Sequence, residues 1–387
     1  MKNREVPKGV RDLLPEEVRI KRWMEKQAVD LFTSYGYEEV ITPTFEFLEV
    51  FENGAGRNIR KDLFLFMDRE GGILSLRPEM TVSIARLAAT HLQEVEYPQR
   101  LYYIANVFRH VQPQIAQYRE FWQIGIELLG ASDIWADAEV ITIAVKALQR
   151  MGVNDFKLSL NHIGIFNSLI SDKGFSGEDR DRIRNLVEKK DLVELSRVLD
   201  SLPIDDALKE SIAKLPVLHG GLNILEQIPR VKSSSQGSAA FDEVRRLYEA
   251  LTITGVSDNI VIDMGVLRGL DYYTGVIFEG YSPQLGYGLL GGGRYDNLMG
   301  QFGLNRPSTG FAIGIDRLAL VLDKKVNEPL RYIVGGNDRA KVYRKACELR
   351  RRGLVVEMDL VSASKEVLAR RAAERNNCRL IYLDEED

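Results

Sequence analysis

The chain has 387 residues, of which 45% are hydrophobic and 28% charged, and its net charge is −4. This length predicts two or three domains, and the composition excludes a disordered protein, a collagen-like repeat and a small disulfide-stabilised domain. The slight acidic excess also excludes the overall basic charge that drives non-specific nucleic-acid binding. A local basic patch is the one such feature that remains possible.

Cysteine and histidine usage argues against a metal centre. The chain has two cysteines and four histidines, and none of them has the spacing of a zinc site. The low cysteine count suits a reducing compartment, so we expect a cytoplasmic protein. The first residues lack the apolar core of a signal peptide, and no apolar run approaches the roughly 20 residues of a membrane span.

Hydrophobic periodicity predicts mixed helix and strand over the first 150 residues. A helix is expected to follow residues 77–81 and to run through residue 88. Pro78 suits a position near its start, and Glu79 lies where the helix dipole favours an anion. The same patterns predict an amphipathic helix over 15–35, a short strand over 38–42, an antiparallel hairpin over 100–109 and 121–130, and a helix over 136–151.

The second half of the chain falls into three parts. After a predicted strand over 156–161, the pattern is almost wholly helical from about 165 to 251, which we interpret as a helical insertion. Strand patterns return over 259–264, 274–281 and 309–315. Beyond a boundary near 327–329, strands and helices alternate, which predicts a small α/β module. We therefore expect one domain over residues 1–325 and a second over 330–387.

The second strand of the predicted hairpin has an unusual face. Period-two alternation places apolar residues on one side and Gln123, Gly125 and Glu127 on the other. An amide and a carboxylate that flank a glycine form a small hollow with an acceptor at each end, which suits an ammonium or imidazole group. The alternative is an outer sheet face that water covers.

A turn after a later apolar strand carries Arg268 beside Tyr272 and Tyr273. A confined arginine can bind a carboxylate through two hydrogen bonds. The alternative is a tight turn in which Arg268 pairs with Asp271.

Small residues dominate two further segments. Gly310, Ala312 and Gly314 share one face of a predicted strand, either as a floor for a flat ring or for close helix packing. The glycine-rich stretch 291–296 fits no phosphate-binding loop and is expected to be a flexible turn. The predicted helix over 339–352 carries seven basic residues, which form either a solvated face or an RNA-binding surface.

Taken in order, these segments resemble the catalytic core of class II aminoacyl-tRNA synthetases, specifically histidyl-tRNA synthetase. The resemblance covers nearly the whole chain, and the run Arg-Gly-Leu-Asp-Tyr-Tyr at 268–273 is specific to the histidine branch. It implies an α+β fold in which helices flank an antiparallel sheet, with a helical insertion and a truncated α/β C-terminal module. The other matching segments are 7–15, 76–81, 107–109, 123–127, 292–296 and 310–317.

The resemblance also implies a histidine-binding pocket. Glu127 and Tyr273 would contact the imidazole. The α-amino group would be held by Glu79, Thr81 and Gln123. The carboxylate would lie near Arg109 and Arg268. The full expected set is Glu79, Thr81, Arg109, Gln123, Glu127, Arg268, Tyr272 and Tyr273.

Several departures separate the chain from an active synthetase. In synthetases the loop of the second motif begins Arg-x-Glu and is rich in cations. Here a valine replaces the glutamate, and Gln112, Ile115 and Gln117 replace the cations. Each lost charge-assisted contact is worth roughly 1.5–3 kcal/mol, so ATP should bind poorly although Arg109 and Arg317 remain. The Glu-x-Thr-Asp loop is absent, and the C-terminal module lacks the last elements of an anticodon-binding domain.

This combination resembles the family of ATP phosphoribosyltransferase regulatory subunits, which are paralogues of histidyl-tRNA synthetase in histidine biosynthesis. It implies a non-catalytic, dimer-forming chain that needs no cofactor or metal and joins the short catalytic subunit in a hetero-octamer. The catalytic subunit would need it for activity and for histidine feedback inhibition. Arg317 would be a remnant of nucleotide binding, and tRNA is not expected to bind. The alternatives are an active histidyl-tRNA synthetase with a divergent loop, or a histidine sensor with another partner.

Overall fold

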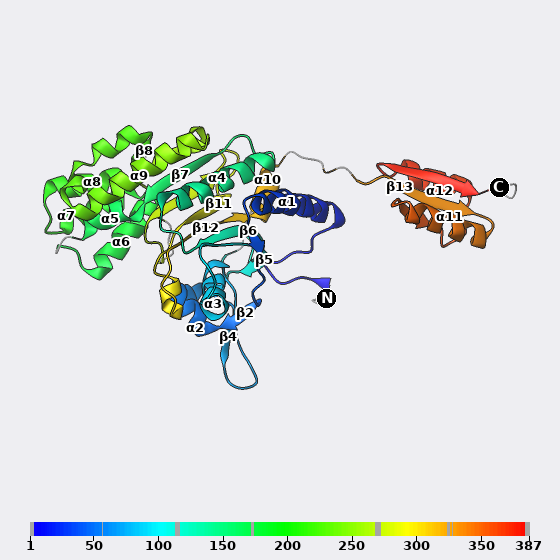
Figure 1. Cartoon of the computed structure of the whole chain (residues 1–387), viewed down its shortest axis with the longest axis horizontal. Coiled ribbons are helices and arrows are strands. Elements are labelled where there is room, and N and C mark those ends of the chain that lie inside the picture. Colours follow the sequence, from blue (N-terminus) through cyan, green and yellow to red (C-terminus); the bar gives the residue numbers. More distant parts are fainter. Residues whose placement is uncertain are drawn as a thin grey trace. The chain divides into compact units, whose positions relative to one another are not determined.

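The computed structural model describes residues 4–55, 57–112, 117–171, 174–267, 272–322, 326 and 328–383, with the side chains of 57, 58 and 229 excepted. Arg268 and Ile115 therefore lie outside the described residues. The chain divides into two compact units, Met1–Asp323 and Lys324–Asp387 (Figure 1). We describe each unit by itself.

A nine-stranded sheet forms the centre of the first unit. Neighbouring strands are antiparallel except for two parallel pairs, β1 with β5 and β7 with β9. In spatial order the strands are β1 (Glu38–Glu39), β5 (Gln99–Phe108), β6 (Glu120–Leu129), β12 (Ser308–Gly314), β11 (Leu290–Arg294), β10 (Val276–Tyr281), β7 (Lys157–His162), β9 (Ile260–Asp263) and β8 (His219–Gly220). The predicted antiparallel hairpin of β5 and β6 is confirmed.

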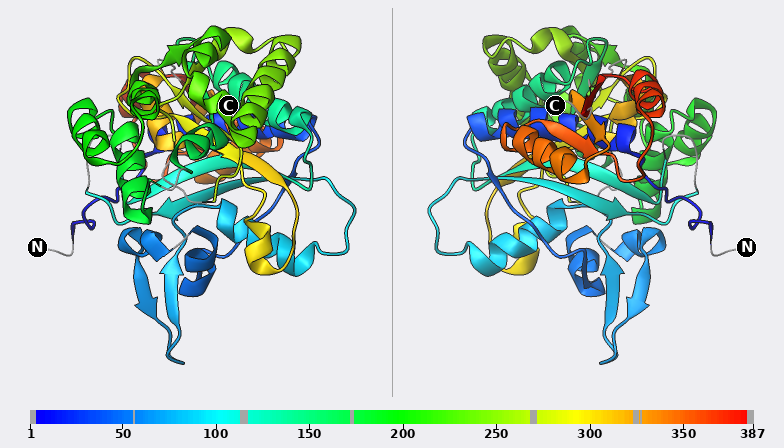
Figure 2. Two further views of the ribbon diagram at one scale, coloured as in Figure 1. Left: turned by 90° about the vertical axis from the view of Figure 1, so that its left-hand side faces the viewer. Right: turned by 90° about the vertical axis from the view of Figure 1, so that its right-hand side faces the viewer.

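Helices cover both faces of this sheet (Figure 2). The α-helices are α1 (Pro15–Ser34), α2 (Leu48–Ala55), α3 (Thr81–His91), α4 (Ile134–Arg150), α5 (Ile163–Ile170), α6 (Gly177–Glu188), α7 (Leu192–Ser201), α8 (Asp206–Lys214), α9 (Ser235–Ile253) and α10 (Ile315–Val321). Short 3-10 turns are η2 (Arg57–Asp62), η3 (Leu215–Val217), η4 (Leu222–Gln227), η5 (Pro229–Ser233), η6 (Ser257–Asn259) and η7 (Met299–Phe302). A small antiparallel sheet, β2 (Phe45–Phe47), β4 (Ile73–Leu76) and β3 (Leu65–Met67), stands beside α2 and α3.

The larger hydrophobic core lies on the face of the sheet that α1 and α4 cover. Ile124 and Ile126 of β6 and Ile313 of β12 are fully buried there, which confirms the predicted apolar face of the hairpin. The insertion helices α5–α9 share this core, because α9 packs against both α4 and α5. A second core on the opposite face joins the sheet to α2, α3 and η7 and contains several tyrosines.

The prediction of a flexible turn over 291–296 is wrong, because residues Leu290–Arg294 form the buried strand β11. Its glycines are needed for close approach: a Cβ on Gly292 would lie 2.6 Å from the ring of Phe278. The strand ends at Arg294, whose guanidinium forms a buried ion pair with Asp137 of α4 (2.8 Å). The glycine-rich sequence therefore builds a strand where neighbouring side chains leave no room.

Other boundaries differ by a few residues from those predicted. The strand expected over 38–42 ends at Glu39, because the carbonyls of Thr42 and Pro43 accept hydrogen bonds from the side chain of Arg77 instead of a neighbouring strand. The helix predicted through residue 88 continues to His91. In the described part of the chain, no helix has the length and apolar character needed to cross a membrane.

The second unit is a three-stranded parallel sheet with helices on both faces. Its elements are β13 (Arg331–Gly336), α11 (Arg339–Arg351), β14 (Val355–Met358), α12 (Lys365–Ala373) and β15 (Cys378–Leu383), in the strand order β14–β13–β15. Separate small cores lie under α11 and α12. This is the alternation of strands and helices that the sequence predicts.

Candidate functional site

A small pocket opens on the face of the central sheet opposite α4. Three strands, β6, β11 and β12, form its floor. The start of α3 and a cluster of tyrosines form its walls. The lining residues are Glu79, Met80, Thr81, Tyr103, Arg109, Gln123, Tyr272, Tyr273, Gly291, Gly292, Tyr295, Gly310, Phe311 and Ala312.

The small residues of β12 make room for a carboxylate. A Cβ on Gly310 would fall on the Glu127 carboxylate and lie 2.5 Å from the Ile126 carbonyl oxygen. Gly310 and Ala312 line this pocket, and Gly314 lines the neighbouring one. The group that the missing side chain of Gly310 accommodates is therefore the Glu127 carboxylate, and not a helix packed closely on this face.

Glu127 points from β6 to this same face of the sheet, over Gly310, with 1% of its surface exposed, so the alternative of a water-covered sheet face is wrong. The hydroxyl of Thr81 donates to one carboxylate oxygen (2.8 Å), and the hydroxyl of Tyr295 donates to the other. Burial raises the pKa of Glu127 to about 8, although the two hydroxyl hydrogen bonds act in the opposite direction. The carboxyl is therefore largely protonated at neutral pH when the pocket is empty.

Glu79 is the second buried carboxyl of the site, and it caps α3. It accepts hydrogen bonds from the backbone N–H groups of Thr81 (2.9 Å) and Val82 (2.8 Å). Burial raises its pKa, and the Val82 N–H and the charge of Arg109 oppose that rise. The helix start thus holds a carboxyl in a pocket wall, as the dipole argument predicts.

We expect Glu127 to make the protein less stable as pH rises. Its folded-state pKa of about 8 exceeds the usual value of about 4.3, so the folded state binds the extra proton between these limits. This contribution to stability is complete below about pH 4.3 and is lost as pH rises to about 8, with a slope of roughly 1.4 kcal/mol per pH unit in between. Urea unfolding at several pH values should show a shallower decline for Glu127→Gln. Equal slopes for the two proteins would contradict the assignment.

Two further polar groups face the pocket from the hairpin. The buried side-chain oxygen of Gln123 has no hydrogen-bond partner in the described structure. Arg109 donates from Nε to the carbonyl of Pro78 (2.9 Å), and its guanidinium lies over the ring of Phe121. An unsatisfied acceptor and a guanidinium on one wall suit a ligand that carries both an ammonium and a carboxylate.

Comparisons with known proteins agree with this architecture. The family model described as histidyl-tRNA synthetase matches residues 9–318. The ATP phosphoribosyltransferase regulatory subunit of Moorella thermoacetica is 41% identical over 373 residues, which are 96% of each chain. That of Desulforamulus reducens is 37% identical and covers 98% of this chain and 95% of its own.

The chain belongs to the family of ATP phosphoribosyltransferase regulatory subunits. A crystal structure of an ATP phosphoribosyltransferase regulatory subunit/histidyl-tRNA synthetase from Bacillus halodurans has a TM-score of 0.86 at 34% identity and covers 98% of both chains. Histidyl-tRNA synthetase from Nostoc sp. PCC 7120 has a TM-score of 0.83 at 21% identity, over 98% of this chain and 92% of that one. The predicted class II synthetase-like fold is thereby confirmed.

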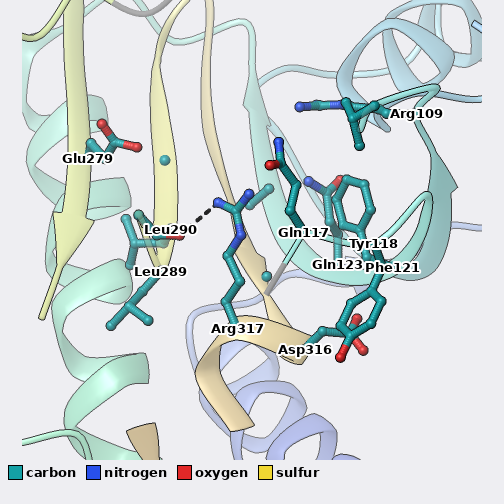
Figure 3. A pocket seen from close by; sticks show the side chains of 15 residues that line it. Arg109, Gln117, Tyr118, Phe121, Gln123, Glu279, Leu289, Leu290, Asp316 and Arg317 are labelled. Carbon is teal, nitrogen blue, oxygen red and sulfur yellow. Dashed lines mark hydrogen bonds between the residues drawn. The ribbon is translucent and has the colours of Figure 1, made fainter. Parts of the chain in front are cut away.

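In this member of the regulatory-subunit family, a second pocket of about 770 Å³ adjoins the first and shares Arg109 and Gln123 with it. Figure 3 shows Arg317 between Glu279 on one side and Gln117 on the other. Arg317 donates to the carbonyl oxygen of Gly288 (3.0 Å). Arg317 thus lies outside the first pocket, and Gln117, one of the expected cation replacements, lines the second.

Sequence analysis missed Tyr103 and Tyr295 as site residues of this family member. Tyr103 faces Gly125 across the hairpin, where a Cβ would lie 2.5 Å from the tyrosine hydroxyl. A glycine in register with a tyrosine is a usable sequence signal for a close contact. Tyr295 was not predicted as a site residue because residues 291–296 were expected to form a flexible turn. Among the described residues, no group of three or more His, Cys, Asp or Glu could hold a metal ion.

Proposed function

We propose that this chain is a non-catalytic regulatory subunit that binds free histidine in the first pocket. The observation that carries the proposal is the composition of that pocket. Six of the eight residues expected to contact histidine line it, and the buried carboxylate of Glu127 accepts a hydrogen bond from one of them, Thr81. The six are Glu79, Thr81, Arg109, Gln123, Tyr272 and Tyr273.

Each part of histidine has a chemical counterpart among these groups. The free acceptor of Gln123, together with Glu79 and Thr81, suits the α-ammonium group. Arg109 suits the carboxylate, because a guanidinium can bind it through two hydrogen bonds. Glu127 and Tyr273 would contact the imidazole. This distribution favours a free amino acid with a polar aromatic side chain.

The regulatory role rests on the names of the relatives and on the altered nucleotide pocket. Gln117 lies where a synthetase would carry a cation, which disfavours triphosphate binding. The chain would activate a short catalytic ATP phosphoribosyltransferase subunit at the first step of histidine biosynthesis and transmit feedback inhibition by histidine. A coupling free energy of about 1–3 kcal/mol is enough for such control. We further propose a cytoplasmic hetero-octamer in which this chain forms dimers and binds no tRNA.

Titration calorimetry of the whole chain with histidine tests the binding step. We expect one site per chain, and we expect Glu127→Ala to abolish the heat of binding because it removes the acceptor for the imidazole. Glu210→Ala, on the exposed surface of α8 and paired with Lys214, is the matched control and should bind like the parent. Unchanged affinity in Glu127→Ala would refute the site.

Reconstitution with the short catalytic subunit tests the regulatory step. We expect phosphoribosyl transfer to require this chain, and histidine to inhibit only the complex. Robust histidine-dependent exchange of pyrophosphate into ATP by this chain alone would contradict the proposal and favour an active synthetase. Co-purification without the phosphoribosyltransferase would favour a sensor with another partner.

A further inference from the structure

Tyr295 occupies a special position in the first pocket. It follows β11 directly, is 2% exposed, and packs its ring edge-on against Tyr272 at 5.8 Å. Its hydroxyl donates to the carboxylate of Glu127, whose other oxygen accepts from Thr81. Because a carboxylate offers about four acceptor positions, these two donors fix its orientation and leave further positions for a ligand.

The surroundings of Glu127 are dominated by hydroxyls and by a second carboxyl. Glu79, at the start of α3, opposes its ionisation, and the hydroxyls of Thr81 and Tyr295 favour it. From β5 the neighbour is the phenol of Tyr103, and from β12 it is the bare backbone of Gly310. More remote groups complete the set: Arg109, whose charge acts on Glu79 and Tyr103, and Tyr37, which Glu127 influences from the other face of the sheet.

We propose that Tyr295 is a positioning residue for ligand recognition: its hydroxyl holds the Glu127 carboxylate so that the remaining acceptor positions meet the imidazole of bound histidine. The inference rests on the proposed function, since it presupposes that histidine is the ligand. Tyr295 acts through Glu127 rather than as a primary contact. Its ring also closes the pocket wall beside Tyr272.

This arrangement predicts how many protons the complex holds. A net charge on the pair formed by Glu127 and the imidazole would be costly in a buried site. We therefore expect the carboxyl and the ring to share one proton, which makes the pair neutral. Free histidine gains a second proton below about pH 6.5, and the empty site loses its proton above about pH 8. Binding should therefore be tightest between these values and weaken on both sides.

The sign of the Tyr295 effect follows from its hydrogen bond. The hydroxyl lowers the pKa of Glu127, so Tyr295→Phe should raise it further. The alkaline decline in histidine affinity should then move to higher pH by about one unit, the shift expected for one hydrogen bond to a charged group. Affinity at pH 7 should also fall about tenfold, because the carboxylate loses its orientation.

The test is calorimetry of the full chain with histidine from pH 5.5 to 9.5. Tyr97→Phe is the matched control, because Tyr97 does not line the pocket and its hydroxyl donates to the carbonyl of Leu92 (2.8 Å), just after α3. It should leave the position of the alkaline decline unchanged. Glu127→Gln should abolish the part of the alkaline decline in affinity that arises from loss of the Glu127 proton. The α-amino group of histidine titrates equally with every variant, so differences between variants report Glu127 alone.

The possible outcomes separate this inference from the proposed function. No binding of histidine to the parent chain would refute the proposed function itself. Binding with an alkaline decline that Tyr295→Phe leaves in place would overturn the role of Tyr295 while histidine binding stands. A shift in Tyr295→Phe, together with a Glu127→Gln profile whose alkaline decline is only that of the histidine α-amino group, would establish the inference. Circular dichroism at each pH confirms that the variants remain folded.

Discussion

Asp137→Ala is expected to lower the free energy of unfolding by about 3–5 kcal/mol. The side chains of Asp137 and Arg294 are almost completely buried, and two guanidinium nitrogens of Arg294 donate to one carboxylate oxygen at 2.8 and 2.9 Å. Removal of the carboxylate leaves the arginine charge buried, and the one ionic partner that remains to it among the described residues is the partly exposed Asp296. Because the pair joins α4 to the end of β11, the loss should also disturb the pocket wall at Tyr295.

Urea unfolding of the parent and the variant measures this effect. Asp30→Ala is the control, since Asp30 pairs with Lys26 and Arg150 on the exposed side of α1. Surface pairs of this kind are worth about 0–1 kcal/mol, so the control should unfold close to the parent. Similar losses of unfolding free energy in the two variants would show that the buried pair contributes no more to stability than a surface pair.

Gly310→Ala is expected to abolish histidine binding, with at least a hundredfold loss of affinity. The added methyl group would fall on the carboxylate of Glu127 and close to the Ile126 carbonyl, so the carboxylate must move off its hydroxyl donors. Overpacking of this kind also costs about 1–3 kcal/mol of stability, which leaves most domains folded.

Gly314→Ala provides an unusually close control. It is the same substitution on the same face of β12, but the nearest atoms to its Cβ are 3.8 Å away, in Arg317 and Leu289. The methyl group fits without displacement, and histidine affinity should stay within about twofold of the parent. Calorimetry of both variants decides the matter: equal affinities would show that the floor at Gly310 does not shape the site.

Much of the fold is predictable because its helices and strands carry strong hydrophobic periods. The hairpin of β5 and β6 lies within one residue of its predicted bounds. Strand β11 is not predictable in this way. Its glycines lack side chains whose alternation could be recognised. Glycine is required there because Phe278 and β12 lie too close for a side chain.

The candidate site shows the same division. The hollow at Gln123 and Glu127 follows from period-two alternation, and its chemistry is visible in the residue types. The burial of Glu127 is not visible in the sequence pattern, because it depends on Tyr295, which lies 168 residues further along the chain. Local pattern alone could not decide between a ligand site and a water-covered face. The resemblance to a known family supplied the choice, and the comparisons confirm that family.

The order of strands in the central sheet has a consequence for folding. β12 inserts between β6 and β11, so the floor of the pocket closes only when residues near 310 reach a hairpin synthesised long before. Tyr272 and Glu79, which meet across the pocket, are separated by 193 residues. Contacts of such long sequence separation form slowly. A ligand that binds only the finished site stabilises the folded chain by mass action, by about 2.7 kcal/mol at a hundredfold excess over its Kd.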